Sequence, residues 1–263
     1  MNRYRIQFAA LIAIAMLAGG CRHGVRRYVT PTIDPQFASL TKEQAFAKAE
    51  DFYNHKKWQR ARSFYQHVYE TSPNDPLGRR SLLRIADTYY QQNDPINLVE
   101  AQYKYRDFIN RYPGSDRADY AMLQIAMVSY QQMERPDRDQ AKTKEAVEKF
   151  NDMIHAYPRG PLKPEAEKRL TEVFDRLAKH EHIVAKYYLK RRSFDAGVRR
   201  LNFLIDTFPN YTNRVGAFYD IANALEYLGR KGEARLYYER VVSEFPKSDY
   251  AGRAKRKLDL IKA

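Results

Sequence analysis

The single thiol of the chain, Cys21, is the side chain best placed for covalent modification. It follows an apolar stretch, residues 6–17, which is itself preceded by Arg3 and Arg5. A charged start and about a dozen apolar residues are typical of a secretory signal, and a bilayer span needs about 20 apolar residues. A free cysteine is most often a small buried residue, but polar residues follow this one directly. We therefore expect acylation of the Cys21 thiol through a thioether.

The residues before Cys21 point to a cleavage site. The segment 17–21, Leu-Ala-Gly-Gly-Cys, resembles the bacterial lipobox, with its Leu four rather than three residues before the Cys. This resemblance implies cleavage between Gly20 and Cys21, so that residues 1–20 form a lipoprotein signal peptide. Arg22 in the second mature position implies an anchor at the periplasmic face of the outer membrane. Residues 21–40 contain Pro31 and Pro35 and predict an extended tether.

The composition favours a globular protein that is not an enzyme. Hydrophobic residues make up 44% of the 263 residues, too many for a disordered chain. One Cys excludes a disulfide framework and a Cys-based zinc site. The six His are scattered, and no metalloprotease, hydrolase or phosphate-loop spacing occurs. The sequence therefore predicts no catalytic residues and no metal site.

The formal charge of +14 raises the question of a nucleic-acid partner. Basic residues cluster between residues 186 and 200 and between 253 and 257. An exported chain meets no genome, and acidic protein or anionic lipid would use the same charge. A solvated basic face without any partner is an equal alternative. We predict no nucleic-acid partner. The alternative is a protein that is not exported, in which residues 1–20 stay as an uncleaved anchor and the basic solenoid binds nucleic acid.

A pattern of small, bulky and proline residues repeats five times after residue 41. It resembles the tetratricopeptide repeat, in which small residues let two helices approach, bulky residues fill the gaps and Pro stops the second helix. The small residues of the first helix are Ala49, Ala86, Ala126, Ala185 and Ala222; those of the second are Ala61, Ala101, Ala146, Gly197 and Ala234; the bulky residues are Tyr65, Tyr105, Phe150, Leu201 and Tyr238; the prolines are Pro73, Pro113, Pro158, Pro209 and Pro246.

These repeats predict an all-α fold, a right-handed α-solenoid of five tetratricopeptide-like helix pairs with a C-terminal capping helix. Residues 41–160 would hold repeats one to three, and residues 161–263 an extended helix, repeats four and five and the cap. Longer spacings in repeats two and three predict extra residues in their inter-helix turns. Ala185 follows Pro158 by 27 residues, whereas the corresponding Pro and Ala are 13 residues apart at three other junctions. This excess of 14 residues predicts that the first helix of repeat four is longer by about four turns, roughly 21 Å. Two halves suggest two partners.

Aromatic residues recur on the first helices of the N-terminal half. In tetratricopeptide folds these helices line a concave groove, and Tyr53, Tyr90 and Tyr130 occupy the inward-facing position. Phe46 and Arg80 lie near them in the repeat register. An extended segment that ends in aromatic residues and a carboxylate would find stacking surfaces and a cation there. The alternative, equally weighted, is that these tyrosines pack between helices.

One segment is more specific than the repeats. Residues 175–191, together with the lipobox, the five repeats and the insertion at residues 138–140, resemble the BamD (ComL) family. The resemblance implies an outer-membrane lipoprotein of the β-barrel assembly machinery that contacts POTRA modules of BamA and helps recognise unfolded barrel proteins. It implies no cofactor. It also places a POTRA contact on the second helix of repeat four, where Arg200 lies.

A related class of protein stays open at this point. Another lipoprotein scaffold with such repeats, serving secretin or pilus assembly or peptidoglycan coordination, would share the lipobox and the solenoid. It would not share the segment from residue 175 to residue 191.

Overall fold

The computed structural model describes residues 39–262, all of which belong to one compact unit except the first. Gly20, Cys21, the predicted signal peptide and nearly all of the predicted tether lie outside the described residues. Between residues 39 and 262 the regular structure consists of eleven helices, without a strand. None of these helices is both long and apolar enough to cross a membrane.

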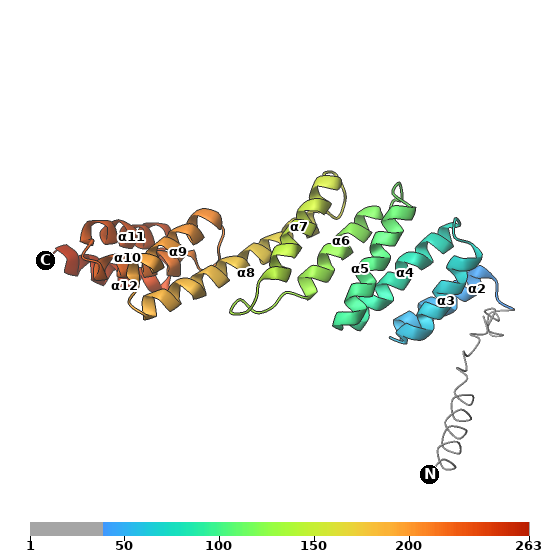
Figure 1. Cartoon of the computed structure of the whole chain (residues 1–263). Helices are drawn as coiled ribbons and strands as arrows, with labels where there is room; N and C mark the ends of the chain where they lie inside the picture. The colour runs from blue at the N-terminus through green and yellow to red at the C-terminus, as the bar shows by residue number, and fades with distance from the viewer. Residues whose placement is uncertain (1–38, 263) are drawn as a thin grey trace, which may run out of the picture. The chain divides into compact units, whose positions relative to one another are not determined.

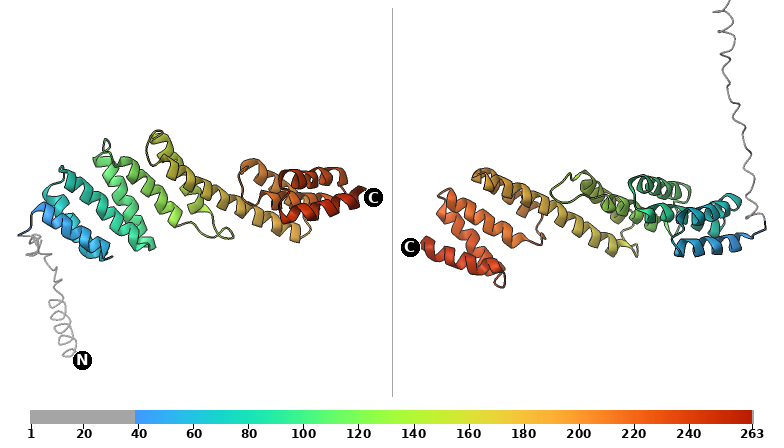
Figure 2. Two further views of the ribbon diagram at one scale, coloured as in Figure 1. Left: turned by 180° about the vertical axis from the view of Figure 1, so that it is seen from behind. Right: turned by 90° about the horizontal axis from the view of Figure 1, so that it is seen from below.

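The helices follow one another as pairs. Neighbours in the chain pack against each other from α2 to α12 (Figures 1 and 2). This arrangement confirms the predicted all-α fold of five helix pairs and a capping helix. The bounds are α2 Lys42–Asn54, α3 Trp58–Thr71, α4 Pro76–Gln92, α5 Pro95–Arg111, α6 Ala118–Gln131, α7 Ala141–Ala156, α8 Lys163–Lys190, α9 Phe194–Thr207, α10 Arg214–Tyr227, α11 Lys231–Glu244 and α12 Asp249–Lys262.

The small residues of the repeat lie at the contacts between paired helices. The five alanines of the first helices and the Ala or Gly residues of the second helices are buried, so the backbones approach closely there. The five bulky residues of the second helices, from Tyr65 to Tyr238, are fully buried beside them. Ser129, which replaces a bulky residue in repeat three, is also buried and donates a hydrogen bond to Glu145. The small and bulky positions of the repeat therefore correspond to buried residues of the core.

Polar side chains cap the starts of several helices. Thr41 and Gln44 form a capping box at the start of α2, while the carboxylates of Asp75 and Asp94 accept backbone hydrogen bonds at the starts of α4 and α5. At the start of the capping helix α12, Ser248 accepts a hydrogen bond from the Ala251 amide.

The prediction for repeat two is wrong in one respect. Its turn contains only Asn93 and Asp94, and the three extra residues lie inside helices instead. The helix α5 begins six residues before Ala101, whereas α3 begins three residues before Ala61. The left-handed conformation of Asn93, with φ 53°, allows this tight turn. In repeat three the insertion does form a loop, residues 132–140.

The helix α8 joins two cores. It has 28 residues, about twice the length of α6 or α10, as the spacing before Ala185 predicts. Ala166 and Val173 belong to a core shared with α6 and α7. Further along the same helix, Ala178 and Ala185 belong to a core shared with α9 to α12. One unbroken helix therefore serves both halves.

Candidate functional site

A cationic groove of about 520 Å³ lies where α4 meets α6 and the segment before it. Arg79 and Arg80 enter it from the first turns of α4, and Arg117 enters it from the residue before α6. All three residues are exposed, and none of them forms an ion pair with another residue between 39 and 262. Asp116 also lines the groove. Three arginines without a partner carboxylate favour an anionic ligand, because a guanidinium binds a carboxylate with two parallel hydrogen bonds.

The floor of the groove is a buried carboxylate. Asp87 accepts hydrogen bonds from the hydroxyls of Tyr105 at 2.7 Å and Tyr120 at 3.0 Å. Arg84 lies 3.3 Å away from its second oxygen. Burial raises the pKa of Asp87, and these three donors oppose that shift. The floor ties α4, α5 and α6 together beneath the arginines.

Arg84 links this floor to the first repeat. Its guanidinium binds the carboxylate of Glu50 through two hydrogen bonds, of 2.8 Å and 2.9 Å. The same guanidinium carbon lies 4.6 Å from the centre of the Tyr53 ring. The Tyr65 hydroxyl donates a third hydrogen bond to Glu50 at 2.6 Å. Because its donors are used within the protein, Arg84 supports the groove rather than offering a free charge.

Two of the predicted groove residues meet each other directly. The guanidinium of Arg80 lies 5.0 Å from the centre of the Phe46 ring, which is buried beneath it. Tyr53 is half-buried and packs edge-on against Trp58 at 5.1 Å. Burial raises the pKa of Tyr53. The aromatic rings of repeat one thus support a cation at the surface.

The other two predicted groove residues lie further along the repeats. Tyr90 and Tyr130 are half-buried, and the charge of Arg169 on α8 acts on both hydroxyls. The Tyr130 hydroxyl donates a 2.6 Å hydrogen bond to Glu172. This hydrogen bond lowers the pKa of Glu172. The structure therefore divides the predicted tyrosines between two sites, one at Arg84 and one at Arg169.

A second surface surrounds Arg200 on α9. It is a hollow of about 280 Å³, which Arg200 lines together with Arg199, Tyr188, Ala196 and the half-exposed Phe203. Arg200 itself forms a 2.9 Å ion pair with Glu181 on α8. Arg199 is exposed and forms no ion pair with any described residue. This surface offers a cation beside an aromatic ring.

The histidines of α8 hold structure together. His180 contacts the Pro136 carbonyl at 2.7 Å, on the inserted loop, where Arg176 also donates to two carbonyls. His182 is buried and lies 2.9 Å from Asp220 and 3.1 Å from the Tyr211 hydroxyl. Within residues 39–262 there is no group of three or more His, Cys, Asp or Glu residues that could hold a metal.

Sequence reasoning missed the network under the groove. Glu50, Arg84 and Asp87 lie on helix faces that the repeat pattern assigns to packing, next to Ala49 and Ala86. Charged residues beside these small positions were the available signal, because a buried charge needs a partner. No sequence pattern indicated that Arg79 and Arg117 line the same groove, because the distance between them depends on how repeats two and three pack.

The fold and the two surfaces define a helical-repeat protein with two hollows that arginines line. Residues 38–239 match YfiO, described as an outer membrane lipoprotein family, and the chain belongs to that family. The result agrees with the predicted family and with the predicted outer-membrane location.

Relatives in other bacteria cover most of the chain. The outer membrane protein assembly factor BamD of Caulobacter vibrioides is 25% identical over 89% of this chain and 74% of its own length. The protein of the same name from Rickettsia prowazekii is 25% identical over 94% of both chains. That of Neisseria meningitidis serogroup A is 24% identical over 79% of this chain and 80% of its own. All three carry the name of an assembly factor, not that of an enzyme.

The chain is also similar to solved structures of other proteins. The TPR2AB domain of yeast Sti1 is 14% identical and covers 84% of this chain and 83% of its own, with a TM-score of 0.46.

Proposed function

We propose that the protein takes part in the assembly of outer-membrane β-barrel proteins, as a scaffold that binds BamA and unfolded barrel chains. Support comes from relatives named as outer membrane protein assembly factors along most of the chain. The single structural observation that carries the substrate side of the proposal is the groove with three unpaired arginines. No cofactor takes part in this function.

The groove suits the end of an unfolded barrel chain. A terminal carboxylate would bind Arg79, Arg80 and Arg117, and a charge-assisted hydrogen bond contributes about 1.5 to 3 kcal/mol. Phe46 is buried beneath Arg80 and supports it, so aromatic side chains just before that carboxylate would pack on the half-buried Tyr53. Tyr90 and Tyr130 would extend the contact toward α8.

The hollow around Arg200 is the proposed contact with a POTRA module of BamA. A partner with acidic residues would meet Arg199 and Arg200, and an apolar side chain would meet Phe203. The two proposed partners then bind different repeats, the barrel chain on the N-terminal repeats and BamA on repeat four.

Photo-crosslinking in the native host tests the substrate side. A photoreactive residue at Arg117 should capture barrel proteins while they cross the periplasm, since Arg117 is exposed in the groove. The same residue at Lys231, the exposed start of α11, is the matched control. Capture of barrel proteins only at Arg117 supports the proposal. Equal capture at both positions, or capture at neither, contradicts it.

Membrane attachment is proposed to run through Cys21, which lies outside the described residues. Cys21→Ser removes the thiol that acylation needs, so we expect this variant in the soluble periplasmic fraction or unprocessed. Incorporation of labelled palmitate into the wild type and its absence from Cys21→Ser would confirm the site. A Cys21→Ser variant that fractionates with outer membranes as firmly as the wild type, in a strain without the wild-type protein, would show another anchor.

A further inference from the structure

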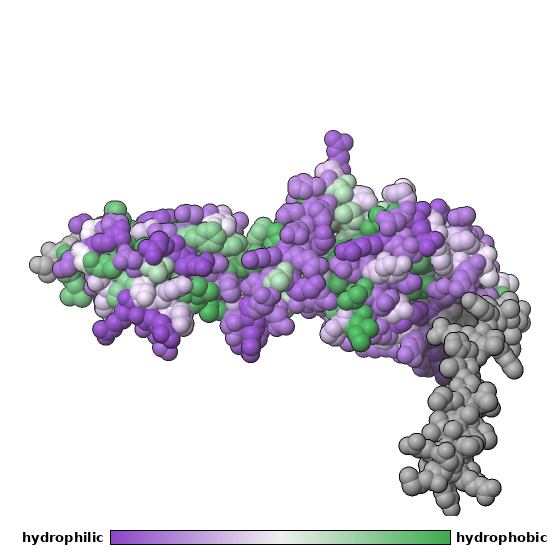
Figure 3. Space-filling model, in the orientation of Figure 1, coloured by the Kyte–Doolittle hydropathy of each residue, from purple (hydrophilic) through white to green (hydrophobic). Residues whose placement is uncertain are grey.

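Three exposed apolar residues form a stripe on α5. Ile96, Val99 and Tyr103 have exposed fractions of 77%, 60% and 62%. Their spacing of three and four residues places them on one face of the helix. Figure 3 shows hydrophobic surface over the lower end of this helix. Single exposed apolar residues are ordinary, whereas a stripe of them marks a contact surface.

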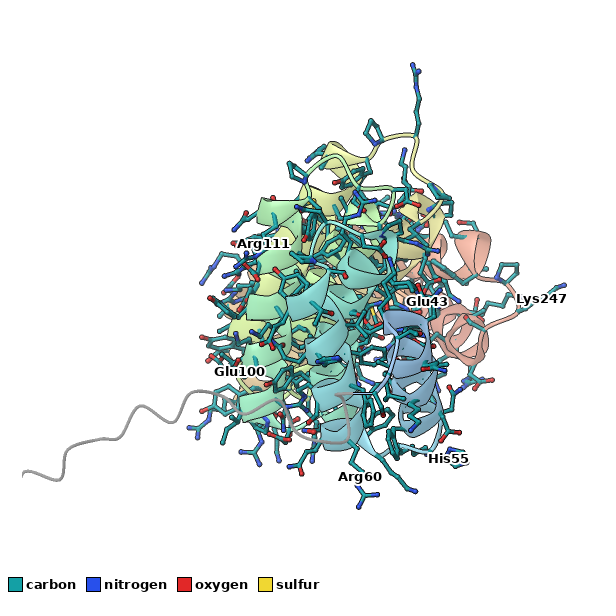
Figure 4. The ribbon with its side chains drawn as sticks, turned by 90° about the vertical axis from the view of Figure 1, so that its right-hand side faces the viewer. Glu43, His55, Arg60, Glu100, Arg111 and Lys247 are labelled. Carbon is teal, nitrogen blue, oxygen red and sulfur yellow. The ribbon has the colours of Figure 1, made fainter. Side chains whose placement is uncertain are left out.

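Basic residues lie at the same end of the first two repeats. Lys56, Lys57 and Arg60 surround a hollow of about 510 Å³ that Trp58 and Gln92 also line. Gln92 ends α4, four residues before Ile96, so the hollow adjoins the start of the apolar stripe. Among the residues that the structure describes, none pairs with these three cations as an ion-pair partner. Figure 4 shows Arg60 pointing outward at this end, close to the turn that carries His55.

The acidic residues nearby do not neutralise this cluster. Asp94 uses its carboxylate to accept backbone hydrogen bonds at the start of α5. Asp51 lies 3.3 Å from His55. Glu100 extends from the flank of α5, apart from Arg60 in Figure 4. The basic hollow and the apolar stripe therefore form one surface, with positive charge beside exposed apolar side chains.

We propose that this surface, formed by Lys56, Lys57, Arg60, Ile96 and Val99, lies against an anionic phospholipid bilayer. We call it the membrane face. Cations near such a bilayer are attracted by the negative headgroups, and apolar side chains enter the boundary between headgroups and acyl chains. The combination of the two on one surface favours lipid over an acidic protein, which would leave Ile96 and Val99 without an apolar partner.

Because the lipid anchor already holds the protein at the membrane, a weak contact between the membrane face and the bilayer is sufficient to orient the protein. Ser39 lies 18 positions after Cys21, a separation of at most about 60 Å for a fully extended chain. The helix α2, 13 residues long, adds about 20 Å between its start and the turn that holds Lys56. The membrane face is thus within reach of the anchoring bilayer, and tethering raises its local concentration there. The inference rests on the proposed attachment through Cys21 and does not depend on the proposed binding of barrel proteins.

Trp58 is a native probe for this contact, because it is the single Trp of the chain and lines the basic hollow. The acylated full-length protein is placed in vesicles of phosphatidylethanolamine with or without phosphatidylglycerol, and quenching of Trp58 fluorescence by acyl chains brominated near the headgroup is measured. We expect quenching with phosphatidylglycerol, and a fall to the level without it for Lys56→Glu with Lys57→Glu and for Ile96→Glu with Val99→Glu.

Leu236→Glu with Leu260→Glu is the matched control, since these residues are 59% and 71% exposed on α11 and α12. This control should keep the wild-type quenching and the same circular dichroism. The anchor is identical in all variants, so a loss of quenching reports the orientation of the membrane face and not attachment. Absence of quenching in the wild type overturns the proposal, as does equal quenching in all variants. A protein captured through Ile96 without lipid quenching also overturns it.

Discussion

The guanidinium of Arg80 lies 5.0 Å from the centre of the Phe46 ring, so that a cation on α4 covers an aromatic ring on α2. This contact crosses from the first repeat to the second and fixes Arg80 at the edge of the groove. Because the buried ring favours the charge without neutralising it, Arg80 keeps its hydrogen-bond donors for a ligand. The relationship explains how packing between repeats can prepare a binding site.

Gly78 tests the packing between repeats one and two. A Cβ atom at this position would lie 1.8 Å from the Ser72 carbonyl oxygen, a backbone atom that cannot move aside cheaply. We expect Gly78→Ala to lower the free energy of unfolding by about 1 to 3 kcal/mol. Denaturant unfolding measures this change.

Gly232 provides the control for that substitution. It lies in α11, and nothing is within 4 Å of an added Cβ atom. Gly232→Ala should therefore raise the free energy of unfolding by about 0.5 to 1 kcal/mol, because Ala favours a helix more than Gly does. Equal effects of the two substitutions would contradict the described contact at Ser72.

The hydrogen bond from Tyr130 to Glu172 should be visible in a titration. It lowers the pKa of Glu172 below the ordinary value for Glu. A lowered pKa contributes stability at pH values above the ordinary pKa, and that stability is lost as the pH falls through the lowered one. Tyr130→Phe should bring the pKa of Glu172 back up and shrink its share of the acid destabilisation. NMR titration of the Glu172 carboxyl carbon measures the shift; an unchanged pKa would mean that the hydroxyl does not hold Glu172.

Charge reversal at Arg200 tests the proposed BamA surface. Arg200→Glu should weaken co-purification of BamA, with a loss of about 2 kcal/mol or more where the charge is desolvated by the partner. The ion pair with Glu181 would break at the same time. Glu181→Gln is therefore the control, since it breaks that pair and leaves Arg200 positive. BamA lost from both variants equally would indicate a role for the pair within the protein, and BamA retained with Arg200→Glu would exclude this surface.

Much of the fold could be predicted because small residues fix helix contacts locally. Ala49 and Ala61 are buried as their spacing requires, and the excess of residues before Ala185 gives the long α8. The extra residues of repeat two could not be placed in this way. A turn of two residues at Asn93 and an earlier start of α5 give the same spacing as a longer turn.

Less of the site could be predicted, because it is formed between repeats. The register placed Phe46 and Arg80 with the tyrosines of the predicted groove, and the structure shows these two residues in contact. It did not place Arg117, which enters the groove from the connection before α6. Nor did it show that Tyr130 is held by Glu172 on α8, 42 residues away. Such contacts depend on the angle between neighbouring pairs, which spacing within one repeat does not specify.

The central claim is that the three-arginine groove binds the carboxylate end of an unfolded barrel chain. Calorimetric titration of the protein with a peptide of a barrel's last strand, compared with the same peptide amidated at its end, tests it most directly. We expect the free carboxylate to bind about tenfold tighter or more, since one charge-assisted hydrogen bond contributes about 1.5 to 3 kcal/mol. That difference should vanish in Arg80→Gln with Arg117→Gln and persist in Arg235→Gln, an exposed arginine on α11. Equal affinity of the two peptides for the wild type would contradict the claim.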